Sequence, residues 1–141
     1  MKTASGIGII YKDLILLAKR IELWNGIPVP LGGYWSIFAG SINQNETLQD
    51  CAIRELYEET QIKVTNHDLI DGCSINNNEL RLKIFFVELD YQPSPTLNEE
   101  HTEYGWFDIH KLKQFPYDIQ EDLIKCIENY KKAQQKKSEK K

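Results

Sequence analysis

The segment GSINQNETLQDCAIRELYEET, residues 40–60, places acidic side chains on the face that a helix at this position must bury. Its apolar residues recur at the spacing of one face of an amphipathic α-helix, at Leu48, Cys51, Ala52 and Leu56. Because an α-helix turns by about 100° per residue, Glu55 and Glu59 point within about 20° of Leu48, and Glu58 borders the same arc. Any fold of this chain therefore has to accommodate carboxylates at the edge of its core.

These carboxylates destabilise the helix unless something neutralises them. Glu55 lies one turn before both Glu58 and Glu59, and each like-charge pair costs about 0.2–0.5 kcal/mol on an exposed helix. All three also lie near the helix end where the dipole disfavours anions. At the edge of a core, two carboxylates about 4 Å apart repel by about 4 kcal/mol at an effective dielectric constant of 20. Such groups must be protonated or neutralised.

Two interpretations of the acidic face remain. The simpler one is a solvated, charged helix surface, on which Arg54 offsets part of the repulsion through Glu58 one turn later. The other is a divalent-cation site, since three carboxylates offer the hard oxygen ligands that Mg²⁺ or Mn²⁺ prefers. No histidine lies near enough in the sequence to indicate zinc. The direction of Glu55 and Glu59 favours the cation site.

The remaining sequence predicts strands mixed with a few helices. Strands are expected over residues 4–11, 14–19, 35–39, 80–89 and 104–107, with an extended segment over residues 62–75. Helices are expected over residues 47–60, with Thr47 as its cap, over residues 108–114, and in a terminal segment marked by Ile119, Leu123, Ile127 and Tyr130. This order predicts an α/β or α+β layered domain.

Length and composition predict one domain and no membrane partner. A chain of 141 residues, 41% of them hydrophobic, has enough apolar side chains for one ordinary core, which we place in residues 1–130. No apolar run approaches the 18 or more residues of a membrane span. The N-terminal apolar run breaks at Tyr11-Lys12-Asp13, which is typical of a strand and its turn rather than of a signal peptide.

Cys51, Cys73 and Cys126 are odd in number, widely spaced and without a CxxC pair. This pattern predicts neither a disulfide framework nor a cysteine zinc site. A reducing cytoplasm is the simplest setting for such a chain.

Charge is unevenly distributed along the chain, whose formal net charge is −4. Residues 131–141, KKAQQKKSEKK, hold six lysines and one glutamate, which leaves eleven basic and twenty acidic residues elsewhere, or −9. We expect this tail to be a frayed, solvated helix end or disordered, and a nucleic-acid arm is the alternative. An acidic body is a poor surface for a polyanion without metal ions, so nucleic acid is not the expected partner.

The acidic segment resembles the Nudix box of the Nudix hydrolases, a MutT-like family. Gly40, five residues, Glu46, seven residues and then RELYEETQI follow its pattern of glycine, five, glutamate, seven, Arg-Glu-apolar-any-Glu-Glu-any-Gly-apolar. Every fixed position matches except the second glycine, which is Gln61 here. The resemblance extends to YWSIFAG before the box and to EEHTEYGWF after it, and it does not select a subgroup.

The resemblance implies an α/β fold, an α/β/α sandwich around a mixed β-sheet with the box as loop–helix–loop. It implies metal ligands in the box and just before it, namely Glu55, Glu58, Glu59 and the carbonyl of Ala39. It also implies that Glu46 and Arg54 form a structural pair that locks the loop to the helix.

The loop after the box supplies a further glutamate in the family. Glu100 is favoured over Glu103 as the loop ligand or general base, because EHTEYGW aligns its first glutamate with a common Glu-His pair. His101 is interpreted as a surface loop histidine. Gln61 stands where the family's glycine ends the box helix, and we expect it to adopt the left-handed conformation.

The activity implied by the resemblance is Mg²⁺-dependent hydrolysis, with Mn²⁺ as a substitute, of a nucleoside diphosphate linked to another group X. The products would be a nucleoside monophosphate and X-phosphate. Arg20 is a candidate phosphate contact, and Trp35 is a candidate to stack on a base. The alternative is a Nudix-fold module that binds a nucleotide without cleaving it. The particular nucleotide and the formation of a homodimer stay open.

Overall fold

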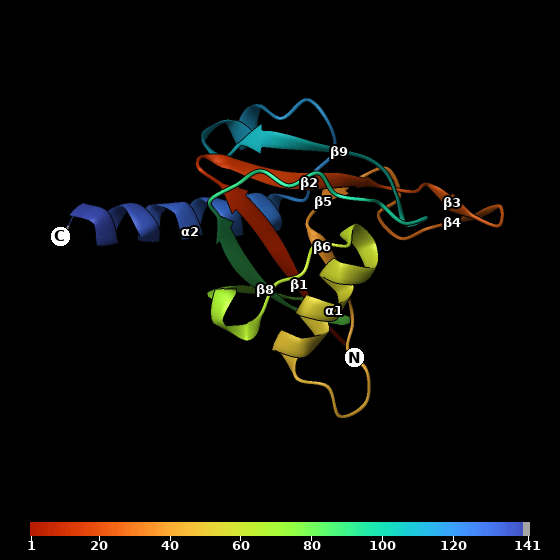
Figure 1. Ribbon diagram of the computed structural model, residues 1–141. Helices are drawn as coiled ribbons and strands as arrows, with labels where there is room; N and C mark the ends of the chain where they lie inside the picture. Colours follow the sequence, from red (N-terminus) through yellow and green to blue (C-terminus); the bar gives the residue numbers. More distant parts are fainter. Residues whose placement is uncertain (140–141) are drawn as a thin grey trace.

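A mixed β-sheet forms the centre of the molecule (Figure 1). The computed structural model describes residues 1–139, with side chains through residue 137. The sheet contains β1 (Lys2–Tyr11), β2 (Leu14–Arg20), β5 (Trp35–Ser36), β6 (Phe38–Ser41), β7 (Ile70–Asn76), β8 (Leu80–Leu89) and β9 (His101–Asp108). Strands β1 and β8 are parallel, and the other pairs are antiparallel. A separate hairpin, β3 (Leu23–Trp24) and β4 (Ile27–Pro28), projects from the body.

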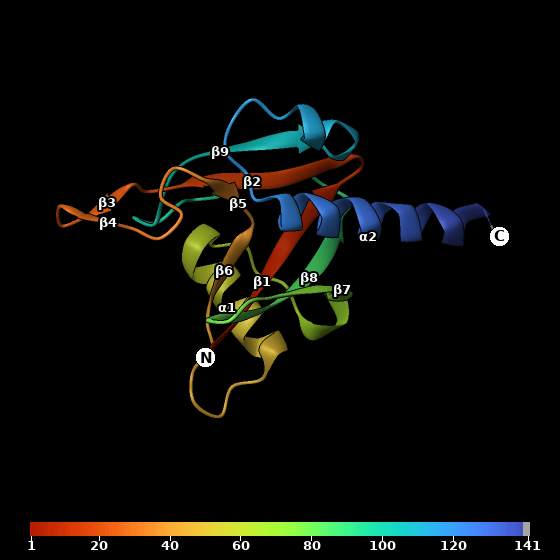
Figure 2. The same ribbon diagram turned by 180° about the vertical axis from the view of Figure 1, so that it is seen from behind.

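Two helices cover opposite faces of this sheet, α1 (Leu48–Thr60) on one and α2 (Glu121–Glu139) on the other (Figures 1 and 2). Two short 3₁₀ helices, η1 (Asn66–Asp68) and η2 (Ile109–Gln114), complete the described elements. The buried hydrophobic residues divide in the same way, into one cluster with Leu56 of α1 and another with Ile127 of α2. The predicted α/β/α sandwich around a mixed sheet is confirmed.

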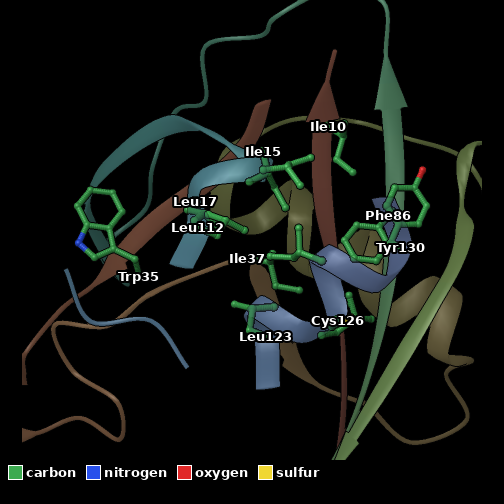
Figure 3. Close-up of a cluster of buried hydrophobic side chains, with 13 residues drawn as sticks. Ile10, Ile15, Leu17, Trp35, Ile37, Phe86, Leu112, Leu123, Cys126 and Tyr130 are labelled. Carbon is green, nitrogen blue, oxygen red and sulfur yellow. The ribbon is translucent and has the colours of Figure 1, made fainter. Parts of the chain in front are cut away.

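The core on the α2 face joins the terminal helix to the sheet (Figure 3). The expected amphipathic face is present, and Leu123, Cys126, Ile127 and Tyr130 are buried against β-strand side chains. The rings of Tyr130 and Phe86 stack with centroids 4.3 Å apart. Burying a large apolar side chain of this kind contributes about 1.5–3 kcal/mol. Beyond Tyr130 the helix continues past the sheet to Glu139, while residues 140–141 of the basic tail lie outside the described residues.

Helix α1 begins and ends where its sequence predicts. The Thr47 hydroxyl accepts a hydrogen bond from the Asp50 backbone N–H at 3.0 Å, which satisfies one of the free donors at the helix start. At the other end, Gln61 has φ 64° and ψ 15°, the left-handed conformation, and its N–H donates to the Tyr57 carbonyl. The left-handed cap expected at Gln61 is therefore confirmed. The helix keeps its register through the acidic residues that precede this cap.

A disulfide joins Cys73 of β7 to Cys126 of α2, with Cα atoms 5.9 Å apart. The expectation that the cysteines form no disulfide framework was wrong for this pair, because the two residues are 53 positions apart and meet only where α2 packs on β7. Cys51 stays a free thiol, buried in α1. A reducing cytoplasm was inferred from the expectation that the cysteines form no disulfide, and this bond contradicts that expectation. The cytoplasmic location therefore stays a prediction that the cysteines no longer support.

Two smaller expectations were wrong in detail. Within residues 62–75 the strand begins only at Ile70, because the capping box of Thr65 and Asp68 starts η1 first. The strand expected over residues 35–39 is divided into β5 and β6. In the described chain, neither long helix has the apolar composition that crossing a membrane requires.

Candidate active site

Helix α1 presents its glutamates to three different environments. Glu59 is completely buried, Glu55 is partly buried, and the side chain of Glu58 is 52% exposed. This order follows from the helical geometry, because Glu55 and Glu59 share the azimuth of the apolar face and Glu58 lies at its border. The acidic face is therefore not a uniformly solvated surface.

Arg54 organises the outer glutamates into an ion-pair network, which we call the box network (Glu46, Arg54, Glu55 and Glu58). Its guanidinium donates two hydrogen bonds to Glu46, from Nε to Oε2 at 2.8 Å and from Nη2 to Oε1 at 3.0 Å. Nη1 donates to Glu55 at 2.9 Å and to Glu58 at 3.2 Å. Glu46 also accepts a hydrogen bond from the backbone N–H of Asn43 in the loop before α1. Together with the bidentate contact to Arg54, this bond connects the loop to the helix.

The titration of Glu46 reflects this contact. Hydrogen bonds from Arg54 and from the Asn43 backbone lower the pKa of Glu46 to about 2. The structure thus places Glu46 and Arg54 in the arrangement that the resemblance implied.

Gly40 allows the loop to approach the helix closely. A methyl group at Gly40 would overlap the Glu55 carboxyl group, so any larger residue would displace that carboxylate. Ala39, whose carbonyl is a candidate ligand, precedes Gly40 in β6 and pairs with Gly6 of β1. The first glycine of the box therefore has a steric role at the site.

A second group of polar residues lies between α1 and the ends of β2 and β9, and we call it the buried cluster (Arg20, Glu59, Glu100 and His101) after its two buried members. Glu59 and His101 are buried, Arg20 is partly buried and Glu100 is exposed. Donor atoms of Glu59, Glu100 and His101 all lie within 4.8 Å of one another. Arg20 pairs with His101 in the register of β2 and β9. Neither oxygen of Glu59, neither ring nitrogen of His101, nor Nε of Arg20 has a hydrogen-bond partner among the described residues.

Burial dominates the electrostatics of the buried cluster. Loss of hydration, together with the negative charges of Glu100 and Glu55, raises the pKa of Glu59 to about 10. Burial also raises the pKa of Glu55, against the attraction of Arg54. For His101, burial and then the neighbouring Arg20 lower the pKa to about 4, so its imidazole is neutral near pH 7. A cation placed in this cluster would reverse the penalty for ionising Glu59.

The structure separates the two loop glutamates. Glu100 belongs to the buried cluster, whereas Glu103 lies on β9 with its side chain 60% exposed and 3.9 Å from Lys19. The resemblance to the family's Glu-His pair favours Glu100 over Glu103, and the fold places Glu100 beside Glu59.

Trp35 is a core residue at the border of a pocket. Its ring contacts Phe107, Phe115 and Tyr117, so its faces are already occupied. The pocket beside it has a volume of about 390 Å³, and its wall includes Lys19, Glu103 and the exposed Tyr117. Tyr117, which the sequence did not single out, is therefore the more accessible aromatic ring.

The interpretation of His101 as a surface residue was wrong. His101 is only 5% exposed, because β9 begins at this residue opposite Arg20 and its ring packs edge-on against Phe38. The pairing of β9 with β2 buries His101, and the sequence of neither strand alone specifies the register of that pairing. In the sequence, the neighbouring Glu100 is the feature that could have pointed to His101 as a site residue.

Comparison with known families identifies the class to which this sandwich and acidic helix belong. Residues 2–130 match the family model of the NUDIX domain, so the chain belongs to the Nudix family. It is similar to the NAD-capped RNA hydrolase NudC of Chromobacterium violaceum, with 32% identity over 87 residues, which are 62% of this chain and 33% of that protein. It is also similar to the dihydroneopterin triphosphate diphosphatase of Haemophilus influenzae, with 31% identity over 102 residues, 71% of this chain and 60% of that protein.

The chain thus spans about one third to three fifths of the length of these curated relatives. Among solved structures, the MutT protein of Methanosarcina mazei Go1 superposes with a TM-score of 0.76 at 20% identity, over 94% of both chains. The NUDIX domain of Shewanella oneidensis NrtR, complexed with ADP ribose, has a TM-score of 0.75 at 17% identity, over 94% of this chain and 88% of that one. These structural similarities establish the fold.

Proposed function

We propose that this protein is a divalent-metal-dependent hydrolase that cleaves a diphosphate linkage in a nucleoside diphosphate derivative. The observation that carries the proposal is the buried carboxyl group of Glu59, whose oxygens have no hydrogen-bond partner in the described chain and face Glu100. A buried, unpaired carboxylate is costly unless a cation neutralises it. Membership of the Nudix family and similarity to two named phosphate-cleaving enzymes support the same class of reaction.

The residues present fit a site for Mg²⁺ or Mn²⁺. Glu55, Glu58 and Glu59 would supply carboxylate oxygens, with the Ala39 carbonyl and Glu100 as further ligands. Glu103 points to Lys19 instead and is the less suitable candidate. Bound Mg²⁺ would polarise the phosphorus and lower the pKa of the attacking water.

The chain's own residues provide the remaining functions. Arg20, with an unpaired Nε in the described contacts, is suited to hold a phosphate oxygen of the substrate. Glu100 would accept a proton from the attacking water, whose oxygen forms a bond to one phosphorus while the bridging P–O bond breaks. The products are then a nucleoside monophosphate and X-phosphate. The pocket bordered by Trp35 and Tyr117 would accommodate an aromatic end of the substrate.

The test is a panel of nucleoside diphosphate derivatives with Mg²⁺ or Mn²⁺, scored for release of monophosphate. ADP-ribose, dinucleotides and a pterin triphosphate are included because their chemistry matches the relatives' names. In parallel, the metal ions should raise the melting temperature of the parent protein but not of the double variant Glu58→Gln, Glu59→Gln. Binding of nucleotides without release of products would favour the non-catalytic alternative. Equal metal shifts in both proteins would place the ions outside this site.

A further inference from the structure

We propose that His101 is a nitrogen ligand for a divalent ion in this site, and that it makes the site prefer a transition-metal ion such as Mn²⁺ over Mg²⁺. The inference rests on the proposed metal site and adds a ligand that the box pattern does not contain. It concerns the selectivity of the site for its metal, which can be measured without any hydrolysis.

The first argument is the burial of an unpaired imidazole. His101 is 5% exposed, and neither Nδ1 nor Nε2 has a hydrogen-bond partner in the part of the chain that the structure describes. Buried polar groups in native proteins are nearly always paired, and an unpaired one costs about 1–3 kcal/mol. A partner from outside the chain is therefore expected at this ring.

The second argument is the distance between the two buried side chains. Nδ1 of His101 lies 3.9 Å from Oε1 of Glu59, which is too long for a hydrogen bond. Two ligand atoms that each lie about 2.1 Å from one ion are separated by up to about 4.2 Å. The observed separation therefore lies within the span of two ligands of a shared ion, and Glu100 offers a third donor within 4.8 Å, which can reach the ion after a small movement of its exposed side chain.

The third argument is that the ring is held in place. Phe38 packs edge-on against the imidazole, with centroids 5.2 Å apart, and β9 fixes the backbone of His101 opposite Arg20. A ligand already oriented by its surroundings loses little freedom when an ion binds.

The chemistry of the donor set then determines the preferred ion. Mg²⁺ binds oxygen ligands in a strict octahedron, and an all-carboxylate site suits it. Imidazole nitrogen suits first-row transition-metal ions, and Mn²⁺, although it binds most weakly in that series, accepts a nitrogen ligand more readily than the hard Mg²⁺ ion does. Adding His101 to Glu59 and Glu100 should therefore increase the affinity for Mn²⁺ more than that for Mg²⁺.

The experiment compares the parent chain with His101→Gln, using His67→Gln as the matched control because His67 is exposed in η1. Calorimetric titration measures the affinities for Mn²⁺ and for Mg²⁺ separately. Pulsed EPR of bound Mn²⁺ tests directly for coupling to an imidazole ¹⁴N. His101→Asn is a second variant, and melting in EDTA shows that each variant is folded.

The parent and His67→Gln should both show the ¹⁴N coupling. In His101→Gln and His101→Asn the coupling should vanish, and Mn²⁺ affinity should fall by about tenfold or more, while Mg²⁺ affinity changes by less than about threefold. A parent that binds Mn²⁺ without ¹⁴N coupling, or a variant that loses both ions equally, would overturn the His101 assignment alone. A parent that binds neither ion would overturn the proposed metal site and, with it, the proposed function.

Discussion

The box network and the buried cluster occupy the same helix and loops, but they differ in how their charges are satisfied. In the box network, Arg54 donates to Glu46, Glu55 and Glu58, and its side chain is partly exposed. In the buried cluster, Glu59 and His101 are almost inaccessible to water and lack partners among the described residues. Adjacent residues of one helix, Glu58 and Glu59, thus belong to opposite electrostatic environments.

The difference separates the structural pair Glu46–Arg54 from the binding residue Glu59, whereas Glu55 and Glu58 both contact Arg54 and are proposed metal ligands. A carboxylate with a bidentate arginine is stabilised by the fold itself and requires no further ligand. A buried carboxylate without a partner destabilises the fold until it is protonated or binds a cation. The same residue type therefore indicates structure at Glu46 and ligand binding at Glu59.

The largest effect should come from changing the buried cluster. Glu59→Gln should reduce hydrolysis by at least about a hundredfold, because a metal ion contributes several kcal/mol to the reaction and each 1.4 kcal/mol is a factor of ten. The melting temperature without metal should hold or rise, since glutamine is neutral and the folded state no longer has to take up a proton to bury this side chain. Steady-state rates and thermal melts in EDTA measure the two effects, with Glu121→Gln on exposed α2 as the control. An active Glu59→Gln protein would remove the distinction between the two regions.

The box network should respond in the opposite way. Arg54→Ala leaves three glutamates without their cation and should lower the free energy of unfolding by about 1–2 kcal/mol, allowing for its partial exposure. Lys19→Ala, which removes the exposed contact with Glu103, should cost less than about 0.5 kcal/mol. Urea denaturation measures both values. If the Arg54 and Lys19 variants lost equal stability, the box network would have no special structural role.

A pH titration of the metal-free protein tests the difference between Glu59 in the buried cluster and Glu46 in the box network. The pKa of Glu59 is raised from 4.5 to about 10 on folding, so the folded state keeps a proton that the unfolded state releases. Its contribution to stability is complete below pH 4.5 and is lost as the pH rises toward 10. Between pH 7 and 9, the unfolding free energy should fall with a slope of at most about 1.4 kcal/mol per pH unit.

The variant Glu59→Gln should flatten this slope, whereas Glu46→Gln should leave it unchanged. The pKa of Glu46 is lowered to about 2, so its contribution is present above pH 4.5 and is lost only as the pH falls toward 2. Denaturation curves in EDTA at several pH values provide the measurement. A slope that persists in Glu59→Gln would assign the buried proton to another group.

The sequence predicted the parts of this site that depend on local geometry. The burial of Glu59 followed from the helical repeat, and the Arg54–Glu46 contact followed from the family pattern. The sequence could not predict the environment of His101. The pairing of β9 with β2 determines which side chains become buried where the loop joins β9. The disulfide between Cys73 and Cys126 was missed for the same reason, since two distant segments create it.

Trp35 shows another property that the sequence alone does not predict. An aromatic residue in a Gly- and Pro-rich loop suits either a ligand site or a core, and composition alone does not separate the two. Phe107, Phe115 and Tyr117 pack around its ring, and Trp35 also borders the pocket beside Lys19. Stacking of Trp35 on a base therefore stays a prediction.

The smallest expected effect comes from changing Gln61 at the end of α1. This change tests whether the helix end influences the box network or the buried cluster. Gln61 adopts a left-handed conformation, with φ 64°, two residues after Glu59. A side chain with a Cβ costs about 1–2 kcal/mol in this conformation, whereas glycine adopts it freely. Because part of that gain is offset by the greater freedom of glycine in the unfolded chain, Gln61→Gly should stabilise the protein by about 1 kcal/mol.

Hydrolysis should be nearly unchanged in Gln61→Gly, because the left-handed cap already holds the helix register that places Glu58 and Glu59. Denaturant unfolding and steady-state rates provide the two measurements, and Gln61→Ala, which keeps the Cβ, is the matched control and should show little gain. A stabilised but inactive Gln61→Gly variant would mean that the strained cap positions the buried cluster. A variant that melts below the parent would contradict the left-handed cap, and with it the geometry by which one helix separates Glu58 from Glu59.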